Sequence, residues 1–264
     1  MKKHCDDDAR RLLEGIEEAE AIAVGAGSGL STSAGFVYSG ERFERYFADW
    51  AYWSRYIWYN RYVGTPKDSY EKLLKLLEGK NYFVLTTNVD HQFQHAGFPK
   101  ERLFYTQGDY GLWQCSVPCH ARTYDNYETV KLMIEEQRDM RVPSELVPRC
   151  PKCGTEMSMN LRADNSFVED AGWHEAAGRY RNFTEAHSRG KVLYLELGVG
   201  MNTPVIIKYP FWQNTLANPQ ATYACINYGE AYAPTQIKNR SILISSDIDA
   251  VLSELLEMGD RKEA

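Results

Sequence analysis

The chain has 264 residues, a formal net charge of −6 and 44% hydrophobic residues. This length and apolar content suffice for one large or two unequal domains with a substantial core. The acidic balance and the lack of a long basic run argue against nucleic acid as a partner. No apolar run approaches the ~20 residues that cross a bilayer, and the first residues lack the apolar core of a secretory signal. We therefore expect a cytoplasmic protein without a membrane partner.

A glycine-rich segment over residues 21–35 is the strongest local signal in the sequence. Its apolar run from Ile22 to Val24 predicts a buried parallel strand. Three glycines follow, and they allow tight turns and close approach of a ligand to the backbone: Gly25, Gly27 and Gly29. Ser31-Thr-Ser33 then marks a helix start, where free amides suit a pyrophosphate. An ordinary strand–turn–helix corner without a ligand gives the same pattern.

The remaining chain alternates helix and strand signals. Helices are expected over residues 9–20, 69–78, 127–138 and 247–258, and towards the end of 167–188. Strands are expected over residues 82–85, 103–105, 191–197, 204–209, 221–227 and 241–244. An aromatic stretch that includes Phe43, Tyr46 and Phe47 indicates a segment buried between two domains. The alternation predicts an α/β fold with a Rossmann-like parallel sheet and a ligand crevice at the strand C-termini.

Four of the six cysteines form two close pairs. Three residues separate Cys115 from Cys119, and two residues separate Cys150 from Cys153, about thirty residues further on. Four thiolates can close a tetrahedral structural zinc site, and His120 beside Cys119 is a possible substitute ligand. Unrelated buried thiols are the alternative. We expect zinc, in a structural role that leaves the reaction open.

Polar side chains follow the strand expected over residues 82–85. Asn88 and Asp90 stand two apart, so they can address one ligand, such as a carboxamide and a ribose. They can equally cap the helix that starts there, because Asn and Asp are favoured at N-caps. His91 and His95 share a helical face, but no third metal ligand is evident. We expect solvated or core histidines at these two positions.

In this order, these elements resemble the sirtuin family. The resemblance rests on residues 25–35, on Thr87-Asn-Val-Asp90 with Ala96-Gly97, on the cysteine pairs, on residues 198–204 and on Ile226-Asn227. It implies NAD+ as a co-substrate whose nicotinamide–ribose bond is cleaved. It also implies a Rossmann-like domain from residues 1–35, 67–109 and 190–264, and small helical and zinc-binding insertions at 36–66 and 110–189.

Two departures separate the chain from deacylating sirtuins. Gly35 leads into Phe36 rather than into an Ile-Pro-Asp-Phe-Arg-like run, and Gln107-Gly108 stands where those enzymes carry a catalytic His before a Gly. A glutamine amide cannot accept a proton near pH 7, so little or no deacylation is expected. Both departures resemble the class M, macrodomain-linked sirtuins. That branch is associated with ADP-ribosylation of a lipoylated, glycine cleavage H-like protein and with a partner macrodomain hydrolase.

The resemblance implies an NAD+-dependent protein mono-ADP-ribosyltransferase. Asn88 and Asp90 would hold the nicotinamide amide and the ribose, and Gln107 would orient the ribose hydroxyls. A carboxylate, Asp90 or Asp109, would stabilise the cation-like state at C1′. The expected NAD+-binding set also includes Gly25, Ala26, Gly27, Ser28, Ser31, Gly198, Gly200, Asn202 and Asn227. An NAD+ glycohydrolase, a catalytically silent NAD+ sensor and a weak residual deacylase are the alternatives.

Overall fold

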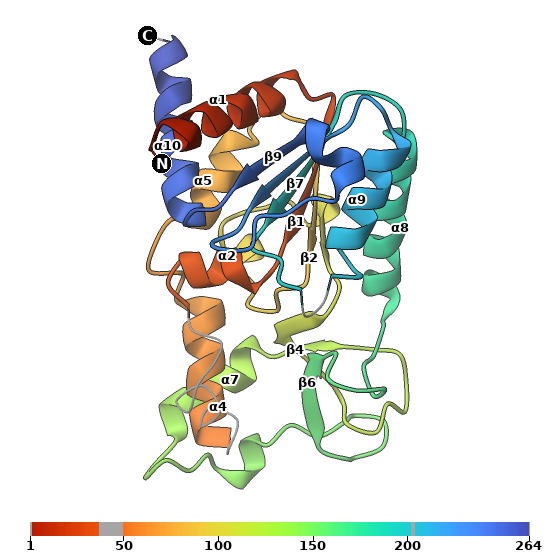
Figure 1. Ribbon diagram of the computed structural model, residues 1–264. Coiled ribbons are helices and arrows are strands. Elements are labelled where there is room, and N and C mark those ends of the chain that lie inside the picture. The colour runs from red at the N-terminus through yellow and green to blue at the C-terminus, as the bar shows by residue number, and fades with distance from the viewer. Residues whose placement is uncertain (1, 37–49, 202–203, 264) are drawn as a thin grey trace.

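A six-stranded parallel sheet organises the chain in the computed structural model, which describes residues 2–36, 50–201 and 204–263 (Figure 1). Its strands are β1 (Ala21–Ala26), β2 (Tyr82–Thr86), β3 (Leu103–Tyr105), β7 (Val192–Leu197), β8 (Thr222–Ile226) and β9 (Ser241–Ile244). Their order is β3-β2-β1-β7-β8-β9, and every neighbouring pair is parallel. The predicted α/β fold is thus confirmed.

Helices cover both faces of this sheet, so its strands read as continuous apolar runs. Along the fully buried β1, Ile22 and Val24 belong to the core on one face, and Ala23 belongs to the core on the other. The first face is covered by α1 (Lys2–Glu18), α5 (Ser69–Leu76) and α10 (Ile248–Glu263). The second face is covered by α8 (Ala171–Ala186), α9 (Lys208–Ala217) and the short helix η4 (Thr235–Arg240). Figure 1 shows these two layers on opposite sides of the strands.

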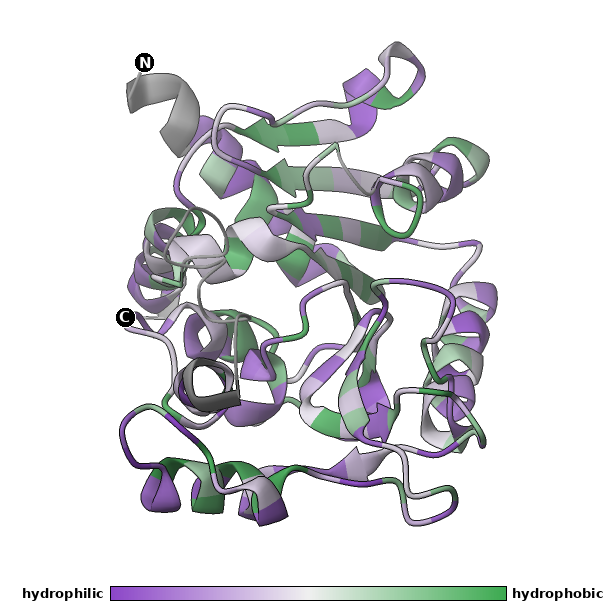
Figure 2. Cartoon of the chain, turned by 90° about the horizontal axis from the view of Figure 1, so that it is seen from below, coloured by the Kyte–Doolittle hydropathy of each residue, from purple (hydrophilic) through white to green (hydrophobic). Residues whose placement is uncertain are grey.

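A smaller antiparallel sheet lies beyond the C-terminal ends of the large one (Figure 1). It consists of β4 (Gly108–Cys115), β5 (Tyr124–Asp125) and β6 (Met157–Leu161). Beside it lie α4 (Trp50–Ile57), the π-helix η1 (Trp58–Tyr62), α7 (Tyr127–Glu136) and the single turn η3 (Ser144–Leu146). The expected helix near residue 127 is confirmed, whereas the strands of this sheet were not expected. β5 has two residues and β6 has five, so each is too short to give a clear strand signal; across the chain, hydrophobic and hydrophilic residues lie side by side along the elements (Figure 2).

The small sheet has a core of its own, built mainly from aromatic and sulfur-containing side chains. Trp53 of α4 stacks on Trp113 of β4, with ring centroids 4.8 Å apart, and Tyr56 packs edge-on against Tyr110. Phe43, Tyr46 and Phe47, which the sequence also placed in this aromatic segment, lie outside the described residues. None of the described helices is both long and apolar enough to span a membrane.

The strand predicted over residues 204–209 is wrong, because the chain there forms a turn and the start of α9. β7 pairs directly with β8, so the sheet has no position for a further strand between them. The apolar residues Ile207 and Phe211 are four apart, which places both on the helix face that packs against the sheet. Lys208 also forms a fully buried ion pair with Glu196 of β7, which fixes the start of α9.

Gly25 leaves room for α9 against β1. A Cβ atom at this position would lie 2.3 Å from Ile207 Cγ2 and 2.7 Å from Phe211 Cε2. We predict that Gly25→Ala lowers the free energy of unfolding in urea by about 1–3 kcal/mol through overpacking. The control Gly178→Ala meets nothing within 4 Å inside α8 and should raise stability by up to about 1 kcal/mol. Equal stability of the two variants would contradict this packing.

Candidate active site

A polar hollow of about 240 Å³ lies at the carboxyl ends of four adjacent strands of the large sheet. The residues that line it follow β1, β2, β3 and β7 directly: Gly27, Ser28, Thr87, Asn88, Gln107, Val199 and Gly200. In open parallel sheets, ligands bind outside the carboxyl ends of the strands. The hollow therefore occupies the position that the sequence predicted for the ligand crevice.

Part of the residue set expected from the sequence lines this hollow. Gly27, Ser28, Asn88, Gln107 and Gly200 are at its wall. Gly25, Ala26, Ser31, Asp90 and Gly198 lie behind the wall as buried residues, Asn227 is half-buried, and Asn202 lies outside the described residues. Thr87 and Val199 were missed. Each is a chain neighbour of an expected residue, and the apolar Val199 carries no chemical signal that a sequence can show.

Two glycine loops pack backbone against backbone beneath the hollow. Gly29 follows β1 and Gly198 follows β7, and the Gly29 amide donates a hydrogen bond of 3.0 Å to the Gly198 carbonyl. A Cβ atom on Gly29 would lie 2.7 Å from Gly198 Cα, and Gly198 has a φ of 61° that favours glycine. The Gly27 amide also donates to Leu197 O. β1 and β7 are already paired along their length, and these glycines let the start of the short helix α2 (Ser28–Ser33) pack directly on the loop after β7.

Asn88 joins the end of β2 to the first glycine loop. Its Nδ2 donates hydrogen bonds to Gly27 O at 3.0 Å and to Ser31 Oγ at 3.1 Å. Within the described part of the chain, its Oδ1 accepts no hydrogen bond, so the amide oxygen remains available at the hollow. Asn88 thus does not cap the short helix α6 (Gln92–His95) that follows.

Asp90 lies behind the hollow and is 1% exposed. Its Oδ2 accepts a hydrogen bond of 2.5 Å from Ser31 Oγ, and its Oδ1 accepts one from the backbone amide of Gln92 at the start of α6. The Tyr70 hydroxyl lies 2.7 Å from the same Ser31 Oγ. Burial and the Asp90 charge raise the pKa of Tyr70, which keeps this phenol protonated. Asp90 therefore accepts a hydrogen bond from the first residue of α6 and anchors Ser31 of the short helix α2 (Ser28–Ser33).

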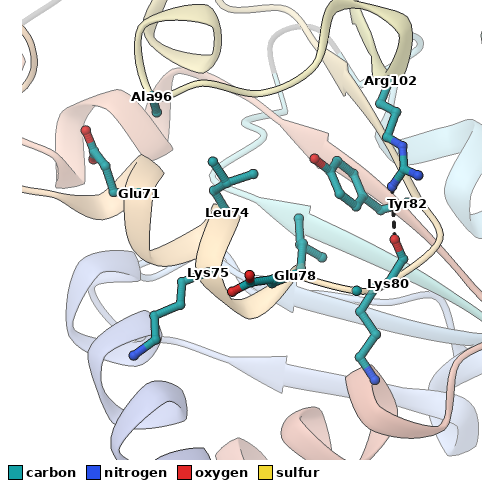
Figure 3. A pocket seen from close by; sticks show the side chains of 10 residues that line it. Glu71, Leu74, Lys75, Glu78, Lys80, Tyr82, Ala96 and Arg102 are labelled. Carbon is teal, nitrogen blue, oxygen red and sulfur yellow. Dashed lines mark hydrogen bonds between the residues drawn. The ribbon is translucent and has the colours of Figure 1, made fainter.

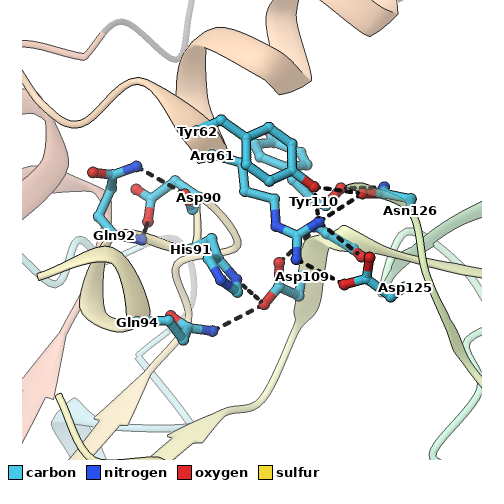
Figure 4. Close-up of polar contacts among 11 residues, drawn as sticks. Arg61, Tyr62, Asp90, His91, Gln92, Gln94, Asp109, Tyr110, Asp125 and Asn126 are labelled. Atoms are coloured by element: carbon cyan, nitrogen blue, oxygen red, sulfur yellow. Dashed lines mark hydrogen bonds and ion pairs between the residues drawn. The ribbon is translucent and has the colours of Figure 1, made fainter. Parts of the chain in front are cut away.

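Asp109 is the second buried carboxylate near the hollow, at 3% exposure (Figure 4). It accepts hydrogen bonds from Gln94 Nε2 at 2.9 Å and from the Gly111 amide at 2.7 Å, and its Oδ2 lies 2.6 Å from His91 Nδ1. Burial raises the pKa of Asp109, but His91, the Arg61 charge and the Gly111 amide outweigh it, so the net pKa lies below its ordinary value. His91 is therefore paired, which its spacing from His95 did not reveal.

Gln107 stands at the end of β3, where the chain crosses into the small sheet. Its side-chain Nε2 donates a hydrogen bond of 3.2 Å to Thr106 Oγ1. Its backbone carbonyl accepts a hydrogen bond of 3.0 Å from the backbone amide of Arg162, just after β6. Trp173 of α8 donates its indole N–H to Thr106 O at 3.2 Å. The position of Gln107 is thus fixed by both sheets.

The four expected metal ligands converge at the small sheet. The Sγ atoms of Cys115, Cys119, Cys150 and Cys153 all lie within 4.8 Å of one another. Cys115 and Cys153 are 3.5 Å apart, and Cys119 and Cys150 are 3.6 Å apart. Tetrahedral zinc with Zn–S bonds of about 2.3 Å requires sulfur separations of about 3.8 Å, so the cluster fits zinc. His120 instead contacts Cys119 Sγ and the Tyr124 hydroxyl.

A larger hollow of about 630 Å³ lies at the other end of β2, beside α5 (Figure 3). Its lining includes the exposed charged residues Glu71, Lys75 and Glu78, together with Lys80 and Arg102. These residues lie near the beginning of β2, whereas Asn88 and Gln107 follow the ends of β2 and β3. Despite its size, this hollow brings together none of the expected site residues.

The chain is similar to two named proteins over most of its length. It is 39% identical to the "Protein ADP-ribosyltransferase" of Staphylococcus aureus over 94% of this chain and 87% of that protein. It is 28% identical to a "Probable bifunctional ADP-ribose hydrolase/ADP-ribosyltransferase" of Fusarium oxysporum f. sp. cubense over 92% of this chain, which spans 47% of the longer fungal protein. No protein-family model matches the sequence.

Solved structures of sirtuins share this fold. The structure of Sir2Tm bound to a propionylated peptide superimposes with a TM-score of 0.65, at 18% identity over 95% of this chain and 98% of that one. A Sir2 structure described as "Sir2-p53 peptide-NAD+" gives a TM-score of 0.64 at the same identity and coverage. At this identity the likeness establishes the fold alone.

The Asp109 environment generates a pH-dependent prediction. Because the folded-state pKa of Asp109 is depressed, its ionised form stabilises the fold above the unfolded-state pKa, and this contribution is lost as pH falls through the folded-state pKa. We predict that Asp109→Asn lowers the free energy of unfolding by about 2 kcal/mol at pH 6, and that its difference from wild type shrinks below about pH 4.

Asp125→Asn is the matched control for this measurement. Asp125 pairs with Arg61 in the same cluster, but its side chain is 64% exposed. Exposed ion pairs contribute at most about 1 kcal/mol, so the control should change stability less than Asp109→Asn does. Urea unfolding of both variants between pH 3 and pH 7 tests this. A constant difference between Asp109→Asn and wild type across that range would contradict the pairing.

Proposed function

Because the chain belongs to the sirtuin-type protein ADP-ribosyltransferases, we propose that it transfers ADP-ribose from NAD+ to a protein acceptor at the polar hollow. The observation that carries this assignment is the meeting of Asn88 and Gln107 with the glycine loops at one edge of the sheet. A dinucleotide needs such an edge, where backbone and amide groups are accessible without large side chains.

The hollow presents amide, hydroxyl and backbone groups that can hydrogen-bond to the polar parts of NAD+. In our proposal, Gly27, Ser28 and Gly200 contact the pyrophosphate from two loops, and Asn227 supports the adenosine side through its hydrogen bond to Val199 O. The buried Ser31, Gly25, Ala26 and Gly198 shape these loops from behind rather than by direct contact. The Asn88 amide oxygen faces the nicotinamide end, where it can accept a hydrogen bond from the carboxamide.

The transfer replaces the bond between nicotinamide and ribose C1′ by a bond to the acceptor. The transition state carries positive charge at C1′, so a fixed carboxylate nearby stabilises it. We assign this electrostatic role to Asp90, because Asp109 is paired with His91 and held by three donors. Gln107 orients the ribose hydroxyls without taking a proton. Since no amide can act as base near pH 7, we propose that deacylation by this chain is weak or absent.

We further propose that the acceptor is a lipoylated, glycine cleavage H-like carrier protein and that a macrodomain hydrolase reverses the modification. The acceptor proposal rests on the class M features of the sequence, namely Phe36 after Gly35 and Gln107 in place of histidine. The name of the fungal relative joins an ADP-ribose hydrolase to an ADP-ribosyltransferase, which supports a hydrolase as functional partner.

Zinc at the four cysteines is proposed as a structural ion. The four sulfurs leave no coordination position for a substrate, and closed Cys₄ sites contribute folding energy rather than chemistry. We predict about one zinc per chain by metal analysis and loss of that zinc in Cys150→Ser. The control Cys225→Ser removes a buried cysteine of β8 and should keep the zinc. A zinc-free wild-type protein with a folded small domain would contradict this role.

The direct test of the proposed function follows labelled NAD+. The purified protein is incubated with the carrier protein in its lipoylated and unlipoylated forms, and both protein label and free nicotinamide are measured. Label on the lipoylated carrier alone is the expected result. Nicotinamide release without protein label would overturn the transferase assignment in favour of a glycohydrolase. A shift in melting temperature with NAD+ but no released nicotinamide would instead identify an NAD+ sensor.

Two asparagines at opposite ends of β2 provide a matched pair of variants. Asn88→Ala removes the amide at the hollow, and we predict a loss of transfer of at least about 100-fold because one positioned polar group is worth this much. Asn81→Ala changes an exposed residue just before β2 and should transfer at the wild-type rate. Initial rates of labelling test the pair. Wild-type transfer by Asn88→Ala would disprove the assigned site.

A further inference from the structure

Three irregular backbone features converge on one buried charged cluster beside the hollow. His91 has a left-handed φ of 64°, which is uncommon for a residue other than glycine. Arg61 belongs to the π-helix η1, and β4 is irregular in register between Asp109 and Trp113. Features of this kind cost free energy and concentrate at functional sites. Their coincidence around His91, Asp109 and Arg61 therefore calls for a functional explanation (Figure 4).

His91 and Asp109 form a dyad in which one imidazole nitrogen contacts the carboxylate and the other is available to a ligand. His91 Nδ1 lies 2.6 Å from Asp109 Oδ2, and Gln94 Nε2 donates to the same oxygen. Within the described residues, His91 Nε2 has no hydrogen-bond partner, and the side chain is 24% exposed. A carboxylate on one ring nitrogen orients the imidazole and leaves the other nitrogen free to accept a proton.

The dyad lies next to the proposed reaction site. His91 follows Asn88 by three residues and Asp109 follows Gln107 by two, so extended chain separates each pair by at most about 11 Å and 7 Å. The two arms are also joined directly, because the Tyr110 amide donates a hydrogen bond of 2.8 Å to Val89 O. The segment after β2 and the segment after β3 thus each connect a residue of the hollow to a member of the dyad.

We propose that His91 is the general base that removes the proton from the acceptor side chain during ADP-ribosyl transfer, an inference that rests on the proposed function. As the acceptor atom bonds to C1′, the bond from C1′ to the nicotinamide nitrogen breaks, and nicotinamide leaves with that electron pair as a neutral molecule. The acceptor's proton moves to His91 Nε2 and then to solvent. Asp109 and Gln94 are positioning residues that hold the ring for this step.

Arg61 supplies a positive charge beside the Asp109 member of the dyad. Asp109 on β4 faces His91, and Arg61 on η1 lies behind Asp109, where it also bonds Asp125, Asn126 and the Gly111 carbonyl. A Cβ atom on Gly111 would lie 2.0 Å from Arg61 Cζ, so glycine at 111 admits the guanidinium. The neighbouring Asp90 is turned towards Ser31. Arg61 balances the Asp109 charge, so the carboxylate can remain ionised while it orients His91.

The test uses the full-length protein, labelled NAD+ and the acceptor that the wild type labels. His91→Asn keeps a residue that tolerates the left-handed backbone but cannot accept the proton. Its rate of label transfer should fall by at least about 100-fold, while the melting-temperature shift produced by NAD+ stays at the wild-type value. Wild-type transfer should decrease as pH falls, because a protonated His91 cannot accept the acceptor's proton, and the variant should lose this dependence.

Chemical rescue separates a catalytic from a merely structural histidine. His91→Gly satisfies the left-handed backbone and leaves space for added imidazole, which should restore at least about a tenth of the lost transfer. The control His95→Asn changes an exposed histidine four residues further on and should transfer normally. Near-wild-type transfer by His91→Asn overturns the proposal, as does a loss of the NAD+ shift without imidazole rescue. A wild type that labels no acceptor overturns the proposed function instead.

Discussion

The contact between the glycine loops after β1 and β7 is the constraint on which the rest of the site depends. Gly29 and Gly198 touch through their backbones, and neither position has room for a Cβ atom. This contact packs together the segments that follow two paired strands, and the Asn88 side chain ties the segment after β2 to the turn after β1 through Gly27 O. The hollow lies where the segments that follow β1, β2 and β7 are held together by these contacts. Its wall is consequently polar backbone and short side chains, which suits a nucleotide.

Two buried carboxylates, Asp90 and Asp109, lie near this point, and they have different hydrogen-bond partners. Asp90 is held by Ser31 and by the start of α6, so it stabilises the segment that follows β1. Asp109 is held by His91 and Gln94 at the junction with the small sheet. A buried carboxylate is tolerated only when its hydrogen bonds are satisfied, and each of these is. The hydrogen-bond donors that stabilise each buried charge also determine which part of the structure that carboxylate holds in place.

Much of the fold was predictable because local signals agreed with it. Apolar runs located all six strands of the large sheet, and the cysteine spacing located the four-cysteine cluster. A seventh strand predicted over residues 204–209 is a turn and the start of α9, which shows that a short apolar run reads equally as strand or helix until its tertiary partners are known. Site geometry was less predictable. The pairing of His91 with Asp109 joins residues 18 apart through a left-handed turn and an irregular strand, which no periodicity encodes.

The central claim is that NAD+ occupies the hollow at the strand ends rather than the larger one beside α5. Amide hydrogen exchange with and without NAD+ tests this most directly, because bound ligand slows exchange where it orders the backbone. We expect slower exchange at residues 27–30, 87–91, 107–110 and 198–200. Residues 71–80, which line much of the larger hollow, should exchange unchanged. Protection centred on residues 71–80, or no protection at the strand ends, would contradict the account.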